Sequence, residues 1–150
     1  KSGDTVNLAA GATAGFGKVL QVVQATDTAE TDTSSTSYVA TGLSVNITPS
    51  SSSNKVLIIA TGVLDNDSAG TAPKVTLFRD STNIGIPDGL SRNYATVRLI
   101  TPVTLSKLDT PNSTSQITYA VYIKSASGAQ VRFGESIQQT IVAMEIAGWL

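Results

Sequence analysis

The fold is decided by residues 42–64, GLSVNITPSSSSNKVLIIATGVL. Leu43, Val45 and Ile47 alternate with polar residues, and this period of two is typical of a strand with one buried face. Residues 56–60 are continuously apolar and rich in β-branched side chains, which predicts a strand covered on both faces. A proline and four serines between the two segments predict a loop. Two such strands indicate a sandwich of β-sheets.

Shorter segments of the same kind, separated by turn signals, lie on both sides of this stretch. In the first of them Leu20 and Val22 would share one face, with Val19 on the other, while residues 25–37 could form either an edge strand or a loop. A segment at 130–133 would pair back as a hairpin on the strand before it. The predicted strands outside the opening stretch are 18–24, 74–79, 83–86, 94–100, 102–108, 117–124, 130–133 and 140–146.

The number and spacing of these strands predict the fold class. No window has a convincing helical period, and eight to ten short strands with turns between them are typical of a sandwich or barrel. We therefore expect an all-β, jelly-roll-like antiparallel β-sandwich at residues 18–150, preceded by a short extended N-terminal segment at residues 1–17.

The composition argues against nucleic acid and membranes as partners. The net charge of −1 creates no field that would attract nucleic acid, and no apolar run approaches the roughly 20 residues of a membrane span. Only 14% of the 150 residues are charged, below the roughly 25% of ordinary soluble domains. Serine and threonine, roughly a quarter of the chain, take the polar role and favour turns and strands. We expect no nucleic-acid partner and no membrane insertion.

The side chains that catalysis most often needs are absent from the sequence. The chain has no histidine and no cysteine, which excludes Ser-His-Asp and Cys-His arrangements and ordinary zinc sites. No glycine-rich loop joins a strand to a helix, so nucleotide binding has no support. A glycosidase needs two positioned carboxylates. The candidates are Asp65, Asp67, Asp80, Asp88, Asp109, Glu135 and Glu145, nearly all in predicted loops. We therefore predict no catalytic residue, no cofactor and no metal.

Three loops are candidate contact surfaces, at residues 65–73, 87–94 and 109–115. Asp65, Asn66 and Asp67 place oxygen atoms at alternate positions, which could hold calcium but lack the glycine and distal glutamate of a full calcium loop; a plain turn is the alternative. In the second loop, Arg92, Asn93 and Tyr94 combine a planar donor, an amide and an aromatic face that could bind a saccharide. The alternative is a loop rim from which Tyr94 enters the core. Asn112 represents the third loop.

The chain ends are candidates for an oligomer interface. Residues 1–17 contain Val6, Leu8 and Phe16 among small residues that cannot build a core, which fits either a flexible lead-in or a place where copies of the chain meet on an axis. At the other end, Trp149 and Leu150 close the chain shortly after the last predicted strand. We expect Trp149 to fill a core or a subunit interface, with a stacking platform for sugar as the alternative.

Eight short segments occur in an order and spacing that resemble a known family. They are GKVLQVV (17–23), TSYVATGL (36–43), VNITPS (45–50), SNKVLI (53–58), LFRDSTNIG (77–85), LDTP (108–111), ITYAV (117–121) and TIVAMEIAG (140–148). Together they resemble a β-rich domain found near the C-terminus of tail-fibre and related structural proteins of tailed bacteriophages. No catalytic motif comes with this resemblance, and Trp149 and Leu150 have no counterpart in it.

The resemblance implies a virion structural protein. Such fibre proteins are generally homotrimers with a shaft that leads into a β-rich head, so residues 1–17 would be the end of a shaft. Self-association, other virion proteins and a host surface glycan are then the expected partners, at a tail fibre. One alternative is a head fibre or decoration protein on the capsid, with residues 1–17 as its anchor. A second alternative is an enzyme that degrades surface polysaccharide.

Overall fold

The computed structural model describes residues 17–67 and 70–148. Its regular elements are β-strands, and no helix occurs in these residues, so none there could cross a membrane. The strands are β1 (Val19–Asp27), β2 (Thr31–Thr33), β3 (Val39–Ile47), β4 (Lys55–Asp65), β5 (Pro73–Arg79), β6 (Thr82–Asn83), β7 (Ser91–Arg92), β8 (Ile100–Asp109), β9 (Ile117–Ser125), β10 (Val131–Phe133) and β11 (Gln139–Ile146).

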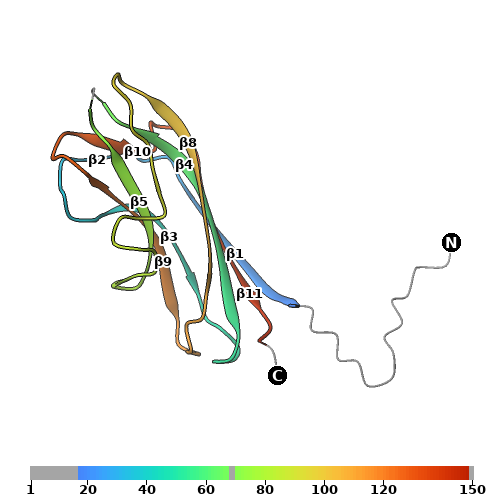
Figure 1. Cartoon of the computed structure of the whole chain (residues 1–150). Helices are drawn as coiled ribbons and strands as arrows, with labels where there is room; N and C mark the ends of the chain where they lie inside the picture. Colours follow the sequence, from blue (N-terminus) through green and yellow to red (C-terminus); the bar gives the residue numbers. More distant parts are fainter. Residues whose placement is uncertain (1–16, 68–69, 149–150) are drawn as a thin grey trace, which may run out of the picture.

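The strands pair as one long hairpin that has been rolled up. Going inward from the two ends, β1 pairs with β11, β3 with β9, β4 with β8 and β5 with β7, all antiparallel. Rolling places β1, β11, β4 and β8 side by side in one sheet, called sheet A, which β10 and β2 extend. Sheet B contains β3, β9 and β5, with β6 and β7 paired to β5. The two sheets face each other as layers (Figure 1). This order is that of a jelly roll and confirms the predicted fold class.

The core lies between the layers, and the opening stretch contributes to both. Leu43, Val45 and Ile47 of β3 are buried as the alternation predicts, and the loop after β3 lies where the proline and serines placed it. From sheet A, the ring of Phe133 fills the space beside Gly62, where any side chain would collide with it. Burying these apolar side chains supplies the main force for closing the two sheets.

The prediction that residues 56–60 are covered on both faces is wrong. Val56, Ile58 and Ala60 point into the core and are buried, whereas Leu57 and Ile59 alternate with them and are only half-buried. The reason is architectural, because a two-layer sandwich covers only the inner face of each sheet. The apolar outer face of β4 therefore remains without a layer over it in the described part of the chain.

Residues 94–99 form no strand, although a strand was predicted from 94 to 100. Side chains of the neighbouring loop hold this segment in place of a ladder: Leu99 donates its backbone N–H to Asn66 Oδ1 at 2.5 Å, and Arg98 pairs with Asp65. The strand begins at Ile100 and runs through Pro102. A proline is tolerated there because β8 is an edge strand of sheet A.

The predicted hairpin between residues 117–124 and 130–133 is also wrong. β10 pairs with β2 and with the end of β4, so the chain crosses from sheet B to sheet A after β9. A turn at the end of β9 directs the chain away from sheet B, and it is stabilised by Ser125 Oγ, which accepts the backbone N–H of Gly128 at 3.0 Å. The crossing buries Val131 and Phe133 in the core between the sheets.

A bulge between Val19 and Gln21 corrects the faces predicted for β1. The extra residue ends the simple alternation, so Val19 is exposed together with Leu20 and Val22. The predicted interface residues Val6, Leu8, Phe16, Trp149 and Leu150 lie outside the described residues. So does the expected lead-in, apart from Gly17.

Candidate functional site

The connection between β6 and β8, residues 84–99, is the main candidate for a contact surface. It is long for a segment whose regular structure is limited to β7, and long loops in compact domains usually carry function. Among the large apolar side chains of the described residues, the three most exposed lie on it: Tyr94 at 66%, Val97 at 65% and Ile86 at 63%. Arg92 is exposed on the same connection.

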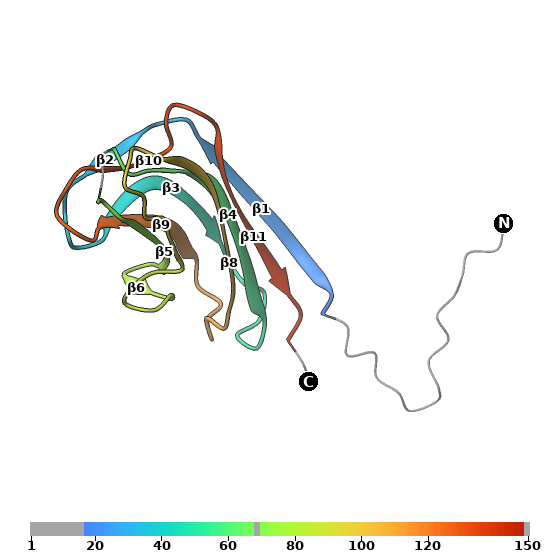
Figure 2. The same cartoon turned by 45° about the horizontal axis from the view of Figure 1, so that its top comes forward.

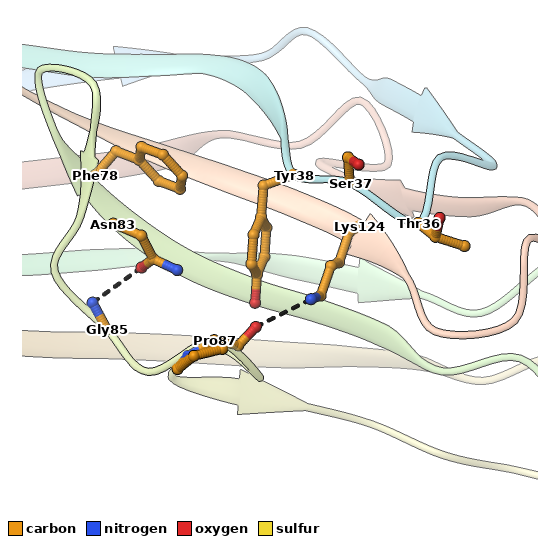
Figure 3. Close-up of a pocket in the computed structure, with 8 residues that line it drawn as sticks. All are labelled: Thr36, Ser37, Tyr38, Phe78, Asn83, Gly85, Pro87 and Lys124. Atoms are coloured by element: carbon orange, nitrogen blue, oxygen red, sulfur yellow. Dashed lines mark hydrogen bonds between the residues drawn. The ribbon is translucent and has the colours of Figure 1, made fainter.

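The start of this connection is fixed to the outer face of sheet B (Figure 3). Lys124 donates from Nζ to the carbonyl of Pro87 at 2.9 Å and lies 4.4 Å from the ring centre of Tyr38. Asn83 Oδ1 accepts the backbone N–H of Gly85 at 2.9 Å. These contacts come from β9, β6 and the segment before β3, so three separate parts of the chain hold the loop base in one position.

A hollow of about 480 Å³ lies between these residues. Phe78 forms part of its wall, stacked at 4.0 Å on Tyr122 and edge-on at 6.0 Å to Tyr38. Burial, together with the negative charge of Asp88, raises the pKa of Tyr38 to about 12. The Lys124 amine is already bonded to the Pro87 carbonyl and is therefore not free for a ligand. We interpret the residues around the hollow as the attachment of the loop to sheet B and not as a ligand site.

Gly89 allows the connection to lie close to sheet B. Its φ of +95° is in the region that favours glycine, and an added Cβ would lie 2.7 Å from both the Tyr38 hydroxyl and the Val75 carbonyl oxygen. The next residue, Leu90, donates its backbone N–H to that same Val75 carbonyl at 2.8 Å. The loop therefore docks on β5 through backbone contact that any larger residue would prevent.

The end of the connection is fixed separately, by the loop after β4. Asn66 is fully buried and donates from Nδ2 to the carbonyl of Val97 at 3.2 Å, while its Oδ1 accepts from Leu99. Gly70 donates its backbone N–H to Ala95 O at 3.0 Å. The structure thus brings two of the predicted contact loops, 65–73 and 87–94, to the same end of the sandwich.

A cluster of carboxylates and arginines surrounds this second anchor. Asp65 is fully buried and pairs with Arg98 at 2.6 Å and Arg132 at 3.4 Å. Burial alone would raise the pKa of Asp65, but the hydrogen bonds and charge of Arg98 outweigh it and hold that pKa below its ordinary value. The pKa of Glu135 is raised because its carboxyl hydrogen-bonds to the Asp65 carboxylate. Glu135 also pairs with Arg98, at 2.9 Å.

The carboxylates considered as catalytic candidates each have a structural partner. Asp65, Asp67 and Glu135 meet in the cluster, where Arg98 binds both oxygens of Asp65. The other four partners lie elsewhere: Lys74 for Asp88, Arg79 for Asp109, the backbone N–H of Thr118 for Asp80, and Ser50 for Glu145. Within residues 17–67 and 70–148, no group of three or more acidic side chains is arranged to hold a metal ion.

The predicted contact residues do not all gather in one place. Asn112 lies beyond the far end of the sandwich, because β8 runs antiparallel to β4, with Ile100 opposite Asp65 and Asp109 opposite Val56. At about 3.3 Å per residue the two ends are roughly 30 Å apart. Tyr94 is exposed, so the alternative in which it enters the core is wrong.

Sequence reasoning missed part of this site. The Nδ2 of Asn93, predicted to contact a saccharide, instead donates to Thr101 Oγ1 at 2.9 Å. The sequence pattern did not indicate Arg98, although the ion pair of this residue with the buried Asp65 holds the connection in place. Its spacing from Asp65 follows no motif. Only the general rule that a buried charge needs a partner could have suggested looking for a cation.

Comparisons with known proteins add little to this description. No family model and no curated protein matches the chain. Among solved structures it is similar to one described as T=1 particles derived from infectious bursal virus, with 14% sequence identity and a TM-score of 0.47. The match covers 97% of this chain but 41% of that chain, so this chain spans less than half of that protein's length. A likeness at this level carries no functional argument.

Proposed function

We propose that this chain is a structural domain of a bacteriophage virion that acts without catalysis, as a homotrimer. The support comes from where the resembling segments lie in the fold. Segments 17–23 and 140–148 fall on the paired strands β1 and β11, and segments 36–43 and 117–121 on the paired strands β3 and β9. A resemblance that covers both partners of two strand pairs covers the framework of the domain, and this is the observation that carries the proposal.

The non-enzymatic part of the proposal has its own support. The sequence has no histidine or cysteine, and the acidic side chains that a glycosidase would use are occupied by arginine, lysine, serine and backbone donors. An inverting or retaining glycosidase needs two carboxyl groups that face a shared substrate. Fibre head and capsid decoration remain two possible positions in the particle under this proposal.

Two measurements test it. Light scattering on the purified chain should give a mass of three times 15.5 kDa, whereas a stable monomer contradicts the trimer. Antibody labelling of intact particles in the electron microscope should place the protein on the tail or on the capsid. Release of sugar from host envelope, lost on changing Asp67 or Glu135 to the amide, would instead establish the polysaccharide-degrading alternative.

A second function, contact with a host surface glycan, is favoured by one observation. The 84–99 connection exposes Tyr94, Arg92 and the aliphatic side chains of Ile86, Val97 and Leu99, on a loop held by hydrogen bonds at both ends. Exposed aromatic and arginine side chains are typical anchors of recognition surfaces. Three copies on one trimer would bind jointly and gain avidity.

Paired alanine variants test this second function. Replacing Arg92 and Tyr94 together should lower binding of the trimer to host cells by at least about tenfold, because each of three weak contacts is weakened. Gln116→Ala, at an exposed position at the opposite end of the sandwich, is the matched control and should bind as the unchanged protein does. Equal binding by all three proteins contradicts a contact through this connection.

A further inference from the structure

The outer face of sheet A carries a continuous apolar row across four strands. Val22 of β1 lies opposite Met144, Met144 opposite Leu57, and Leu57 opposite Leu108. All four point away from the core, and at the two edges Val22 is 57% and Leu108 is 50% exposed. Directly opposed side chains in neighbouring strands lie about 5 Å apart, so these four form one ridge.

The neighbouring rows extend this surface and contain almost no charged side chains. The next row in one direction contains Val142 and Ile59 between two polar residues, and in the other direction Ile146 lies between Val19 and Lys55. Farther along, one row consists of four threonines: Thr26, Thr140, Thr61 and Thr104. We call the outward side chains of these four rows the bare face. Lys55 is its one charged residue among the described residues.

The two sheets differ in how their outer faces are covered. On sheet B, the start of the 84–99 connection lies across the strands, and Lys74 and Lys124 bind to it. On sheet A, β1, β11, β4 and β8 form an outermost layer of the molecule (Figure 2). In most soluble proteins a contiguous exposed apolar patch marks an interaction site.

The size of the bare face suits another copy of the chain. Four strands about 4.8 Å apart and eight residues of about 3.3 Å each give a flat projection of roughly 500 Å². This projection is close to the roughly 600 Å² per partner that a specific interface needs. A face almost without charge meets no like-charge repulsion when it is buried against another copy of the chain. The first and last described residues lie beside the row of Val19 and Ile146, where Ala147 donates its backbone N–H to Lys18 O at 2.8 Å.

We propose that the bare face is where this chain packs against a second copy of itself. The outer halves of Leu57, Ile59, Val142 and Met144 then become buried, which completes the two-sided cover that the sequence of β4 predicts. The inference rests on the multimeric part of the proposed function and deepens it by naming the surface. It places the contact on regular strands rather than on the chain ends alone.

A pair of charged variants tests the surface. Val22→Lys with Leu108→Lys puts two charges on exposed edge positions of the bare face, where a monomer tolerates them. Ala40→Lys with Ser44→Lys, on exposed positions of the edge strand β3 in sheet B, is the matched control. By sedimentation at equal concentration, the first variant should run as a monomer and the control as the unchanged multimer. Circular dichroism should show β-structure in both.

A second measurement keeps the full chain and separates the possible occupants. Because the chain has no cysteine, Leu108→Cys and Ser44→Cys each create one thiol to follow with a labelling reagent. If a second copy covers the bare face, Leu108→Cys should label about tenfold more slowly at high concentration than after dilution to monomer, as when about nine in ten molecules are associated. Slow labelling that does not change on dilution means that the chain covers its own face, and it overturns the proposal.

The remaining outcomes separate this inference from the proposed function. A multimer that survives Val22→Lys with Leu108→Lys overturns the assignment of the face but leaves the trimer standing. If the unchanged chain is a dimer and Val22→Lys with Leu108→Lys converts it to a monomer, the result supports the face and contradicts the trimer. A monomer of the unchanged chain at micromolar concentration contradicts both.

Discussion

At the scale of single residues, Glu145 is the clearest case of a charge that the fold needs. It is buried on the inner side of β11, where its carboxylate accepts hydrogen bonds from Gln21 at 2.6 Å, from Asn54 at 2.5 Å and from both the backbone N–H and hydroxyl of Ser50 at 2.7 and 2.8 Å. Burial alone would raise the pKa of Glu145, but these donors outweigh it and lower the pKa to about 2. The serine loop after β3 is thereby tied to the last strand.

Replacing Glu145 by Gln should lower the free energy of unfolding by roughly 2–3 kcal/mol at pH 7, because donors that bonded a carboxylate lose a charged acceptor. The folded pKa lies below the ordinary value of 4.5, so this contribution is complete above pH 4.5 and is lost as the pH falls towards 2. Urea unfolding at pH 7 and pH 3 should show the difference between the two proteins shrinking. A difference that is independent of pH would contradict this role of the charge.

Tyr119 and Tyr38, whose hydroxyl groups are both buried, provide a matched pair. Tyr119 donates its hydroxyl to Asp109 at 2.7 Å, whereas the buried Tyr38 hydroxyl has no hydrogen-bond partner among the described residues. Tyr119→Phe should therefore lower the free energy of unfolding by about 1.5–3 kcal/mol, and Tyr38→Phe should change it by less than about 1 kcal/mol or raise it. Urea titration at pH 7 measures both. Equal losses in the two variants would mean that the Tyr38 hydroxyl also bonds.

At the scale of elements, the 84–99 connection is held by two anchors that act on different parts of it. Asn66→Ala removes the side chain that bonds Val97 and Leu99, and should speed amide hydrogen exchange at Leu99 by about tenfold or more, since each 1.4 kcal/mol is a factor of ten. Exchange at Leu90, which bonds Val75 in the other anchor, should not change. Asn83→Ala should have the converse effect, at Gly85 and not at Leu99. Faster exchange along the whole connection in either variant contradicts independent anchors.

At the scale of the whole molecule, stability should depend on concentration. If copies bind each other only when folded, association adds to the free energy of unfolding by mass action. The melting temperature of the unchanged chain should then rise with protein concentration, while that of the variant Val22→Lys with Leu108→Lys should stay constant. Scanning calorimetry over a hundredfold range checks this. A constant melting temperature for both proteins contradicts association through the bare face.

Different levels of this molecule were predictable to different extents. Local alternation of apolar and polar residues predicts the faces of β3 and β9, because successive side chains of a strand point alternately into the core and into solvent. Proline and serine predict the loop between β3 and β4. The segment 94–99 and β10 could not be placed that way. The first is held by Asn66 and Arg98, and the second by β2 and β4, so their structure depends on partners more than 30 residues away in the sequence.

The sequence by itself determined the all-β class, most strand positions and the lack of histidine and cysteine, because each of these depends only on residue types and short-range periodicity. The tertiary structure alone decided which strands pair, which loops share an end, and that Asp65 meets Arg98 and Arg132. It also decided that, among the described residues, no further layer covers the outer side of β4. Side-chain alternation specifies two faces of a strand, but only the stacking of layers determines what each face meets.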